Sequence, residues 1–180
     1  PLPSSLTELH CTNITTAALP TLPSSLSYLD CSNNILPTLP TLPSSLTSLY
    51  CNNNPMDSLP ALPNSLLFLY CETATLDSLP TIPTSLVELK CAYNFLINQL
   101  TDLPTLPDNL FRLNSTNNLI TCFPIFPNSL IEFEISANPF TCLPNYIPIM
   151  DSVTLAMYLC KAGDFFHNPN NCAGAVGVLG

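Results

Sequence analysis

Cysteine and histidine are the residues of this chain that could ligate a metal or form a catalytic pair, so their spacing is the first question. The chain has nine cysteines and two histidines. Paired zinc ligands are separated by only about two to four residues, and adjacent in-register positions of parallel strands do not offer disulfide geometry. Five of the cysteines instead recur every 20 residues, at Cys11, Cys31, Cys51, Cys71 and Cys91. We interpret these five as small buried apolar residues.

Catalysis has little support in the sequence. His10 and His167 stand far apart, and serines such as Ser24 and Ser44 belong to predicted turns. No nucleophile, base and orienting group recur near one another. The sequence therefore predicts a protein that is not an enzyme and has no metal and no cofactor.

Leucine and asparagine recur with the same period as the cysteines, so all three belong to one repeating structural unit. Leucines recur at 6, 26, 46, 66 and 86 and again three residues later, and asparagine stands three residues after the cysteine position at Asn34, Asn54, Asn94, Asn118 and Asn138. Ile14 and Ala74 are the exceptions. A four-residue insertion within 94–103 shifts the later copies, in which Ser115 and Ile135 replace the cysteine. Self-similarity of this kind predicts seven stacked copies over residues 1–144.

Each copy has the residue pattern of one short strand and an extended return. The Leu-x-Cys alternation points leucine and cysteine inward from a strand, and stacking makes a parallel sheet on the concave side. The asparagine can bond backbone groups of the turn that leaves the strand. The paired Leu-Pro that follows disfavours helix, so the convex side is expected to be extended or polyproline II, with leucines such as Leu39 and Leu42 entering the core.

The full unit, LxxLxCxxNxL followed by LPxLP, resembles the leucine-rich repeat in its short bacterial form. Repeats of the form LPSSLxxLxCxxN that end in a CLPxxPxM-like segment resemble secreted, cell-surface proteins of Bacteroidota. The resemblance implies a leucine-rich-repeat solenoid on the outer membrane exterior, exported by type IX secretion, with a role in adhesion, gliding or nutrient capture. Host-directed bacterial effectors share the LPxLP signature, although the ubiquitin ligase domain that some of them carry is absent from these residues.

The two ends predict further domains. Pro1 begins inside a repeat, which suggests a piece of a longer chain. Residues 145–172 are expected to form a C-terminal cap containing a helix over 150–162, and 173–180 a linker or the start of a following domain, because all four glycines lie after residue 162. For an exported chain, a disulfide between Cys160 and Cys172, or between Cys142 and Cys172, is a hypothesis.

Charge and hydropathy exclude two classes of partner. The net charge is −9, with Lys90, Lys161 and Arg112 as the only lysines and arginine, which leaves little to neutralise phosphates. Nucleic acid and anionic membrane surfaces are therefore poor partners. No apolar run approaches the roughly 18 residues that span a bilayer, so direct membrane insertion is not expected.

Side chains that flank the inward leucine and cysteine are the candidate binding residues. They include all five glutamates and four of the six tyrosines of the chain. Aromatic side chains beside charged ones are typical of binding hot spots, although any solvated strand face carries polar residues and aromatics favour strands. The predicted ligand-binding residues are Tyr28, Asp30, Tyr50, Phe68, Tyr70, Glu72, Glu88, Lys90, Tyr93 and Arg112.

These observations predict a non-catalytic binding or scaffolding module that recognises a protein, or a glycan, with its concave face. An outer-membrane complex is one expected partner, and the alternative is a host protein recognised by a secreted effector. Three Asp-Ser-apolar sequences resemble the O-glycosylation signal of Bacteroidota and predict a glycoprotein modified at Ser58, Ser78 and Ser152. Two of them are also simply repeat copies, and the third is also a plausible helix cap.

Overall fold

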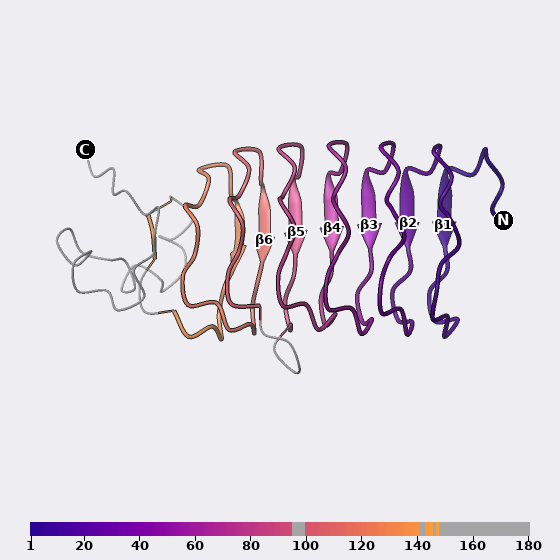
Figure 1. Cartoon of the computed structure of the whole chain (residues 1–180). Helices are drawn as coiled ribbons and strands as arrows, with labels where there is room; N and C mark the ends of the chain where they lie inside the picture. The colour runs from indigo at the N-terminus through magenta and orange to yellow at the C-terminus, as the bar shows by residue number, and fades with distance from the viewer. Residues whose placement is uncertain (95–99, 141–142, 146, 148–180) are drawn as a thin grey trace.

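In the described part of the chain, seven parallel strands form a single sheet whose order is the order of the chain (Figure 1). The computed structural model describes residues 1–94, 100–140, 143–145 and 147. Each strand has three residues and pairs in parallel with the next. The strands are β1 (Glu8–His10), β2 (Tyr28–Asp30), β3 (Ser48–Tyr50), β4 (Phe68–Tyr70), β5 (Glu88–Lys90), β6 (Arg112–Asn114) and β7 (Glu132–Glu134).

The register of the sheet follows the sequence period. Leu9 pairs with Leu29, and Leu29 pairs with Leu49. The four-residue insertion leaves this register intact, since Leu89 pairs with Leu113. Each of the seven predicted copies contains one of these strands, and copy 1 to copy 7 below denote the repeats that contain β1 to β7.

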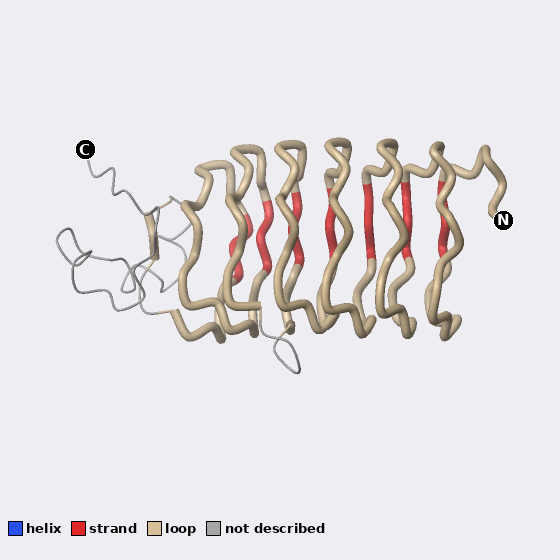
Figure 2. Tube along the Cα trace, viewed as in Figure 1, coloured by secondary structure: helices blue, strands red, loops and turns tan. Residues whose placement is uncertain are grey.

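The strands lie along one side of the solenoid, and loops and turns make up the rest of each coil (Figure 2). Over the described residues the returning segments contain no helix, in agreement with the paired prolines. The predicted helix over 150–162 and the linker over 173–180 lie outside the described residues, as does the predicted cap over 145–172 apart from residues 145 and 147.

The core contains the leucine columns and the cysteine column, as the sequence predicts. Leu26, Leu46 and their equivalents Leu66, Leu86 and Leu110 are fully buried. Leu39 and Leu42 from the returning segments are buried on the other side of the core. The thiols of the cysteine column are free, and four of the five are buried. The buried leucines contribute the main stabilisation, at roughly 1.5–3 kcal/mol for each fully buried side chain.

The asparagine column connects neighbouring copies. The Asn54 amide donates to the carbonyls of Cys31 (3.0 Å) and Cys51 (3.1 Å), and its Oδ1 accepts from the backbone N–H of Leu36 (3.1 Å). Each such asparagine therefore satisfies backbone groups of the preceding copy as well as those of its own turn. In copy 4, where Ala74 replaces the asparagine, the Ala74 carbonyl accepts from the N–H of Met56 instead, at 2.8 Å.

A left-handed backbone conformation recurs in every copy two residues after the cysteine position, and copies 1 and 4 have a second one at Thr15 and Thr75. A positive φ favours glycine, and after it asparagine. No glycine occurs in the repeats, and asparagine fills four of the seven positions. The residues are Asn13, Asn33, Asn53, Thr73, Tyr93, Asn117 and Ala137.

Cys122 differs from the cysteine column because it is disulfide-bonded. It lies in copy 6 and forms an isolated parallel bridge with Asp102. A disulfide at this residue is not among the pairs predicted from the sequence. The cysteines of the predicted pairs, Cys142, Cys160 and Cys172, lie outside the described residues.

Candidate binding site on the strand face

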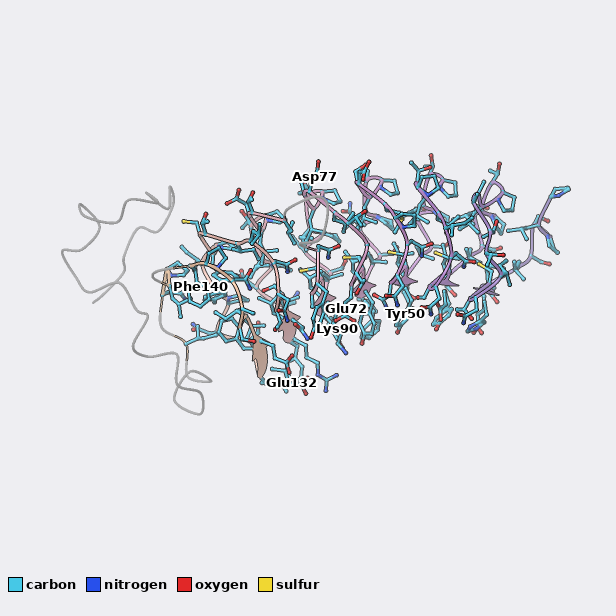
Figure 3. All side chains as sticks on the ribbon, turned by 90° about the horizontal axis from the view of Figure 1, so that it is seen from below. Tyr50, Glu72, Asp77, Lys90, Glu132 and Phe140 are labelled. Carbon is cyan, nitrogen blue, oxygen red and sulfur yellow. The ribbon has the colours of Figure 1, made fainter. Side chains whose placement is uncertain are left out.

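The outward side chains of β1 to β7 form a continuous surface, which we call the strand face. Its two rows are the first residues of the strands and the third residues, and the parallel register places each residue beside its equivalent in the next copy. Figure 3 shows Tyr50, Glu72, Lys90 and Glu132 on one side of the solenoid, with Asp77 on the opposite side. Three of the predicted ligand-binding residues, Tyr50, Glu72 and Lys90, therefore lie on the same side of the solenoid.

Four rings form a ladder across copies 1 to 4. Neighbouring ring centroids are 4.7 Å apart between His10 and Tyr28, 5.3 Å between Tyr28 and Tyr50, and 4.6 Å between Tyr50 and Tyr70. The ladder ends at Lys90, whose Nζ lies 4.5 Å from the centroid of Tyr70. Contacts of this geometry are each worth about 0.5–1.5 kcal/mol beyond the area they bury. The rings therefore hold one another in place, which lowers the entropy lost when a partner binds.

Glu88 joins the ladder to the charged side chains of copies 5 to 7. Its side chain is only 5% exposed and contacts the Nζ of Lys90 and a guanidinium nitrogen of Arg112, each at 3.3 Å. The Tyr70 hydroxyl donates to the same carboxylate at 2.6 Å. Burial alone would raise the pKa of Glu88, but the hydrogen bonds from Tyr70, Lys90 and Arg112 outweigh it and lower the pKa below its usual value.

Arg112 extends this network by an ion pair with Glu132, at 3.0 Å from Nε to the carboxylate. The two cations that the sequence analysis assigns to ligand binding, Lys90 and Arg112, are thus already paired with the chain's own glutamates. Their positions are fixed by the fold, and the network presents little positive charge to a partner.

Glu72 has the opposite environment to Glu88. Over the described residues its carboxylate forms no hydrogen bond and no ion pair, although its side chain is partly buried. Burial raises the pKa of Glu72, Lys90 opposes this, and the charge of Glu134 adds to it. Glu72 is therefore an anion that the fold leaves without a direct partner.

Not all predicted residues gather in one place. Phe68 is half-buried at the start of β4, and Tyr93 stands just after β5 at a left-handed position with half of its surface exposed. Neither is part of the ring ladder. Asp30 accepts from the backbone N–H of Ser32 at 3.1 Å, so its carboxylate also stabilises the turn after β2.

Three residues of the strand face are not among the predicted ligand-binding residues. His10 is the first ring of the ladder. Glu132 pairs with Arg112, and Glu134 accepts from the side-chain amide of Asn114 at 2.7 Å. The repeat period places all three at outward strand positions, but it does not show that they contact the predicted binding residues.

The predicted modification sites lie away from this surface. Ser58 and Ser78 are exposed in the segments that return from the strands, and the Ser78 hydroxyl donates to Asp77 at 2.9 Å. Ser152 lies outside the described residues. Glycosylation of these serines stays a prediction.

Within the described residues, no three His, Cys, Asp or Glu side chains gather closely enough to hold a metal ion. In the same part of the chain, no helix is long and apolar enough to cross a membrane.

Comparison with solved structures shows where this architecture occurs. YopM from Yersinia enterocolitica WA-314 shares 33% sequence identity, with a TM-score of 0.66 over 83% of this chain. A Shigella effector leucine-rich-repeat domain shares 32%, with a TM-score of 0.69 over 79% of this chain. YopM of Yersinia pestis, a leucine-rich effector protein, shares 28%, with a TM-score of 0.65 over 82% of this chain.

The chain is a parallel β-solenoid that matches leucine-rich-repeat structures. The predicted repeat fold is thereby confirmed, whereas the resemblance to Bacteroidota proteins stays a prediction. The chain spans 37%, 62% and 48% of the lengths of these three chains. No protein-family model and no curated protein matches it.

Proposed function

We propose that this leucine-rich-repeat solenoid is a non-catalytic module that binds a protein partner through the strand face. The observation that carries the proposal is the ladder of His10, Tyr28, Tyr50 and Tyr70, which is rigid and open to solvent on one side. The similarity to repeat domains of bacterial effectors supports a protein as the partner.

Tyrosine suits this task because its ring has an apolar body and a polar tip. Burial raises the pKa of Tyr50 and of Tyr70, and the nearby Glu88 acts in the same direction. Both phenols therefore stay neutral at physiological pH. A partner can bury the rings without removing a charge from water, which would be costly.

Two biological settings follow from different observations. The repeat pattern and its resemblance to Bacteroidota proteins support a secreted or cell-surface module that acts in adhesion, gliding or nutrient capture, within an outer-membrane complex or on a glycan. The structural similarity to Yersinia and Shigella effector proteins supports a secreted, host-directed effector whose repeats recognise a host protein. The second setting has support from sequence identity as well as from fold.

The test is affinity capture with crosslinking, performed on bacterial envelope extract and on host-cell extract with the double variant Tyr50→Ala/Tyr70→Ala. The matched control is Thr21→Ala/Thr41→Ala, because both threonines are exposed on the returning segments of neighbouring coils. We expect partners captured by the wild type and by the threonine control to be lost from the tyrosine variant. Equal capture by all three would refute the strand face as the binding surface, and the extract that yields the partner distinguishes the two settings.

A further inference from the structure

The residues directly before the strands form a column that is polar in copies 1 to 3 and apolar in copies 4 to 7. In copies 1 to 3 they are Thr7, Ser27 and Thr47, and in copies 4 to 7 they are Leu67, Val87, Phe111 and Ile131. In copies 1 to 3, hydroxyl groups of this column form hydrogen bonds with the backbone of the preceding copy. The Ser27 hydroxyl donates to the carbonyl of Thr7 at 3.0 Å, and the Thr47 hydroxyl donates to that of Ser27 at 2.9 Å.

The second half of the column is a continuous apolar stripe. Backbone hydrogen bonds join its members in sequence, from Val87 N–H to Leu67 O at 2.9 Å, from Phe111 N–H to Val87 O at 2.7 Å, and from Ile131 N–H to Phe111 O at 2.9 Å. We call Leu67, Val87, Phe111 and Ile131 the edge stripe.

The solenoid does not need apolar residues at these positions. Leu67 and Val87 are only half-buried, and Phe111 and Ile131 remain 39% and 46% exposed. The same backbone carries threonine and serine in copies 1 to 3 and forms the same sheet. Adjacent apolar side chains that a fold leaves exposed are typical of surfaces that bind a partner.

The edge stripe borders the acidic half of the strand face. The Arg112 guanidinium carbon lies 5.9 Å from the centroid of the Phe111 ring, and Arg112 also pairs with Glu132. A ligand that contacts Phe111 is therefore within reach of the carboxylates of β7.

The net negative charge of the strand face determines which kind of ligand it attracts. The strand face and the residues just after its strands carry six carboxylates against two cations, and both cations contact Glu88. Cationic side chains are attracted by this surface and anionic ones are repelled. The carboxylates are Glu8, Asp30, Glu72, Glu88, Glu132 and Glu134.

We propose that the partner binds through a cationic segment with interspersed apolar residues, which lays its apolar side chains on the edge stripe and its basic side chains toward Glu72, Glu132 and Glu134. This inference rests on the proposed function, because it names the chemistry of the protein that the strand face recognises. It places the main contact in copies 4 to 7, where the edge stripe and these carboxylates adjoin.

The test is selection of random short peptides displayed on phage against the wild-type protein. Peptides with lysine or arginine next to apolar residues are expected to be enriched, and their binding should weaken as salt is raised. The selected peptides are then measured on the variant Leu67→Thr/Val87→Thr/Phe111→Thr/Ile131→Thr, which copies the chemistry of copies 1 to 3. We expect affinity to fall roughly ten- to hundredfold, as removal of several apolar contacts implies.

A milder variant, Phe111→Thr/Ile131→Thr, changes only the two most exposed members and covers the case in which the fourfold variant does not fold. Enrichment of peptides without basic residues, no enrichment at all, or unchanged affinity for both threonine variants would overturn the inference. If such peptides still lost affinity on Tyr50→Ala/Tyr70→Ala, the strand face would remain the binding surface and only the edge stripe would be rejected. If neither the threonine nor the alanine substitutions lowered the affinity for the peptides, the proposed function would be refuted as well.

Discussion

Glu88 and Glu72 lie on the same surface, yet their removal should change stability in opposite directions. Two variants test this, Glu88→Gln and Glu72→Gln. Glutamine is chosen because it keeps the shape of the glutamate side chain and removes its charge. Glu88 contacts Tyr70, Lys90 and Arg112, whereas Glu72 has no direct partner in the described part of the chain. The charge of Glu88 therefore stabilises the folded state, whereas the charge of Glu72 does not.

The expected loss for Glu88→Gln follows from the contacts that glutamine cannot keep. Its amide oxygen still accepts from Tyr70, but both cation contacts lose their charge partner. A hydrogen bond to a charged group is worth about 1.5–3 kcal/mol, but Lys90 and Arg112 are 34% and 42% exposed, so solvent screens both pairs. Exposed pairs contribute about 0.2–1 kcal/mol each, and we expect a total loss of about 1–2 kcal/mol. For Glu72→Gln we expect a gain below about 1 kcal/mol.

The pH dependence separates the two effects further. The pKa of Glu88 is lowered in the folded state, so its stabilisation is present above the unfolded value of about 4.3 and is lost as the pH falls through the folded pKa. The difference between the unfolding free energies of wild type and Glu88→Gln should therefore narrow as the pH falls below about 4.3, and it should close below the lowered folded pKa. The pKa of Glu72 is raised, so its charge destabilises the fold above the folded pKa, and the advantage of Glu72→Gln should vanish below about pH 4.3.

The assay is urea unfolding followed by circular dichroism, at neutral pH and through a series of acidic buffers, with the midpoints compared at constant m-value. The two variants serve as controls for each other because both remove one negative charge from the same surface. Equal shifts of the same sign would show that net charge, and not the local contacts of Glu88, determines stability. A Glu88→Gln protein as stable as the wild type at neutral pH would refute the reasoning.

Two further predictions concern the cysteine column. Ser115 occupies a cysteine position in copy 6 and is fully buried, and its hydroxyl has no hydrogen-bond partner among the described residues. Because a buried unpaired hydroxyl costs about 1–3 kcal/mol, Ser115→Cys should raise the urea midpoint, and a lower midpoint would contradict this. Burial raises the pKa of Cys31 to about 12 and that of Cys51 well above its usual value, whereas Cys11 is less buried. Iodoacetamide at mildly alkaline pH should therefore label Cys11 of the native protein first, and mass spectrometry that finds Cys51 labelled at the same rate would contradict the buried column.

The sequence predicts the coil geometry well because one period controls it. Leu29 and Leu49 must be adjacent once the copies stack in register, and no information beyond the spacing is needed. The left-handed position two residues after the cysteine is harder to predict, since Thr73, Tyr93 and Ala137 occupy it beside asparagine and no glycine marks it. The disulfide at Cys122 could not be read from spacing, because three other cysteines were equally plausible members of a pair.

The candidate site is only partly visible in the sequence. Tyr28 is the first residue of its strand and Tyr50 is the third of the next, so the two belong to different outward rows. Their ring contact depends on rotamers, which a repeat pattern does not specify. The burial of Glu88 is likewise unexpected for an outward position and arises because Tyr70 and two long cationic side chains cover it.

The asparagine column also gives the solenoid a direction of assembly. The Oδ1 of Asn34 accepts from the N–H groups of Ile14 and Thr16, and that of Asn94 accepts from Ala74 and Leu76. In each case the acceptor belongs to the later copy and the donors belong to the earlier one. These N–H groups in the turn of one coil are thus satisfied by the coil that follows it. On the ribosome, the most recently made repeat would keep open backbone donors until its successor emerges, so folding would trail synthesis by one repeat.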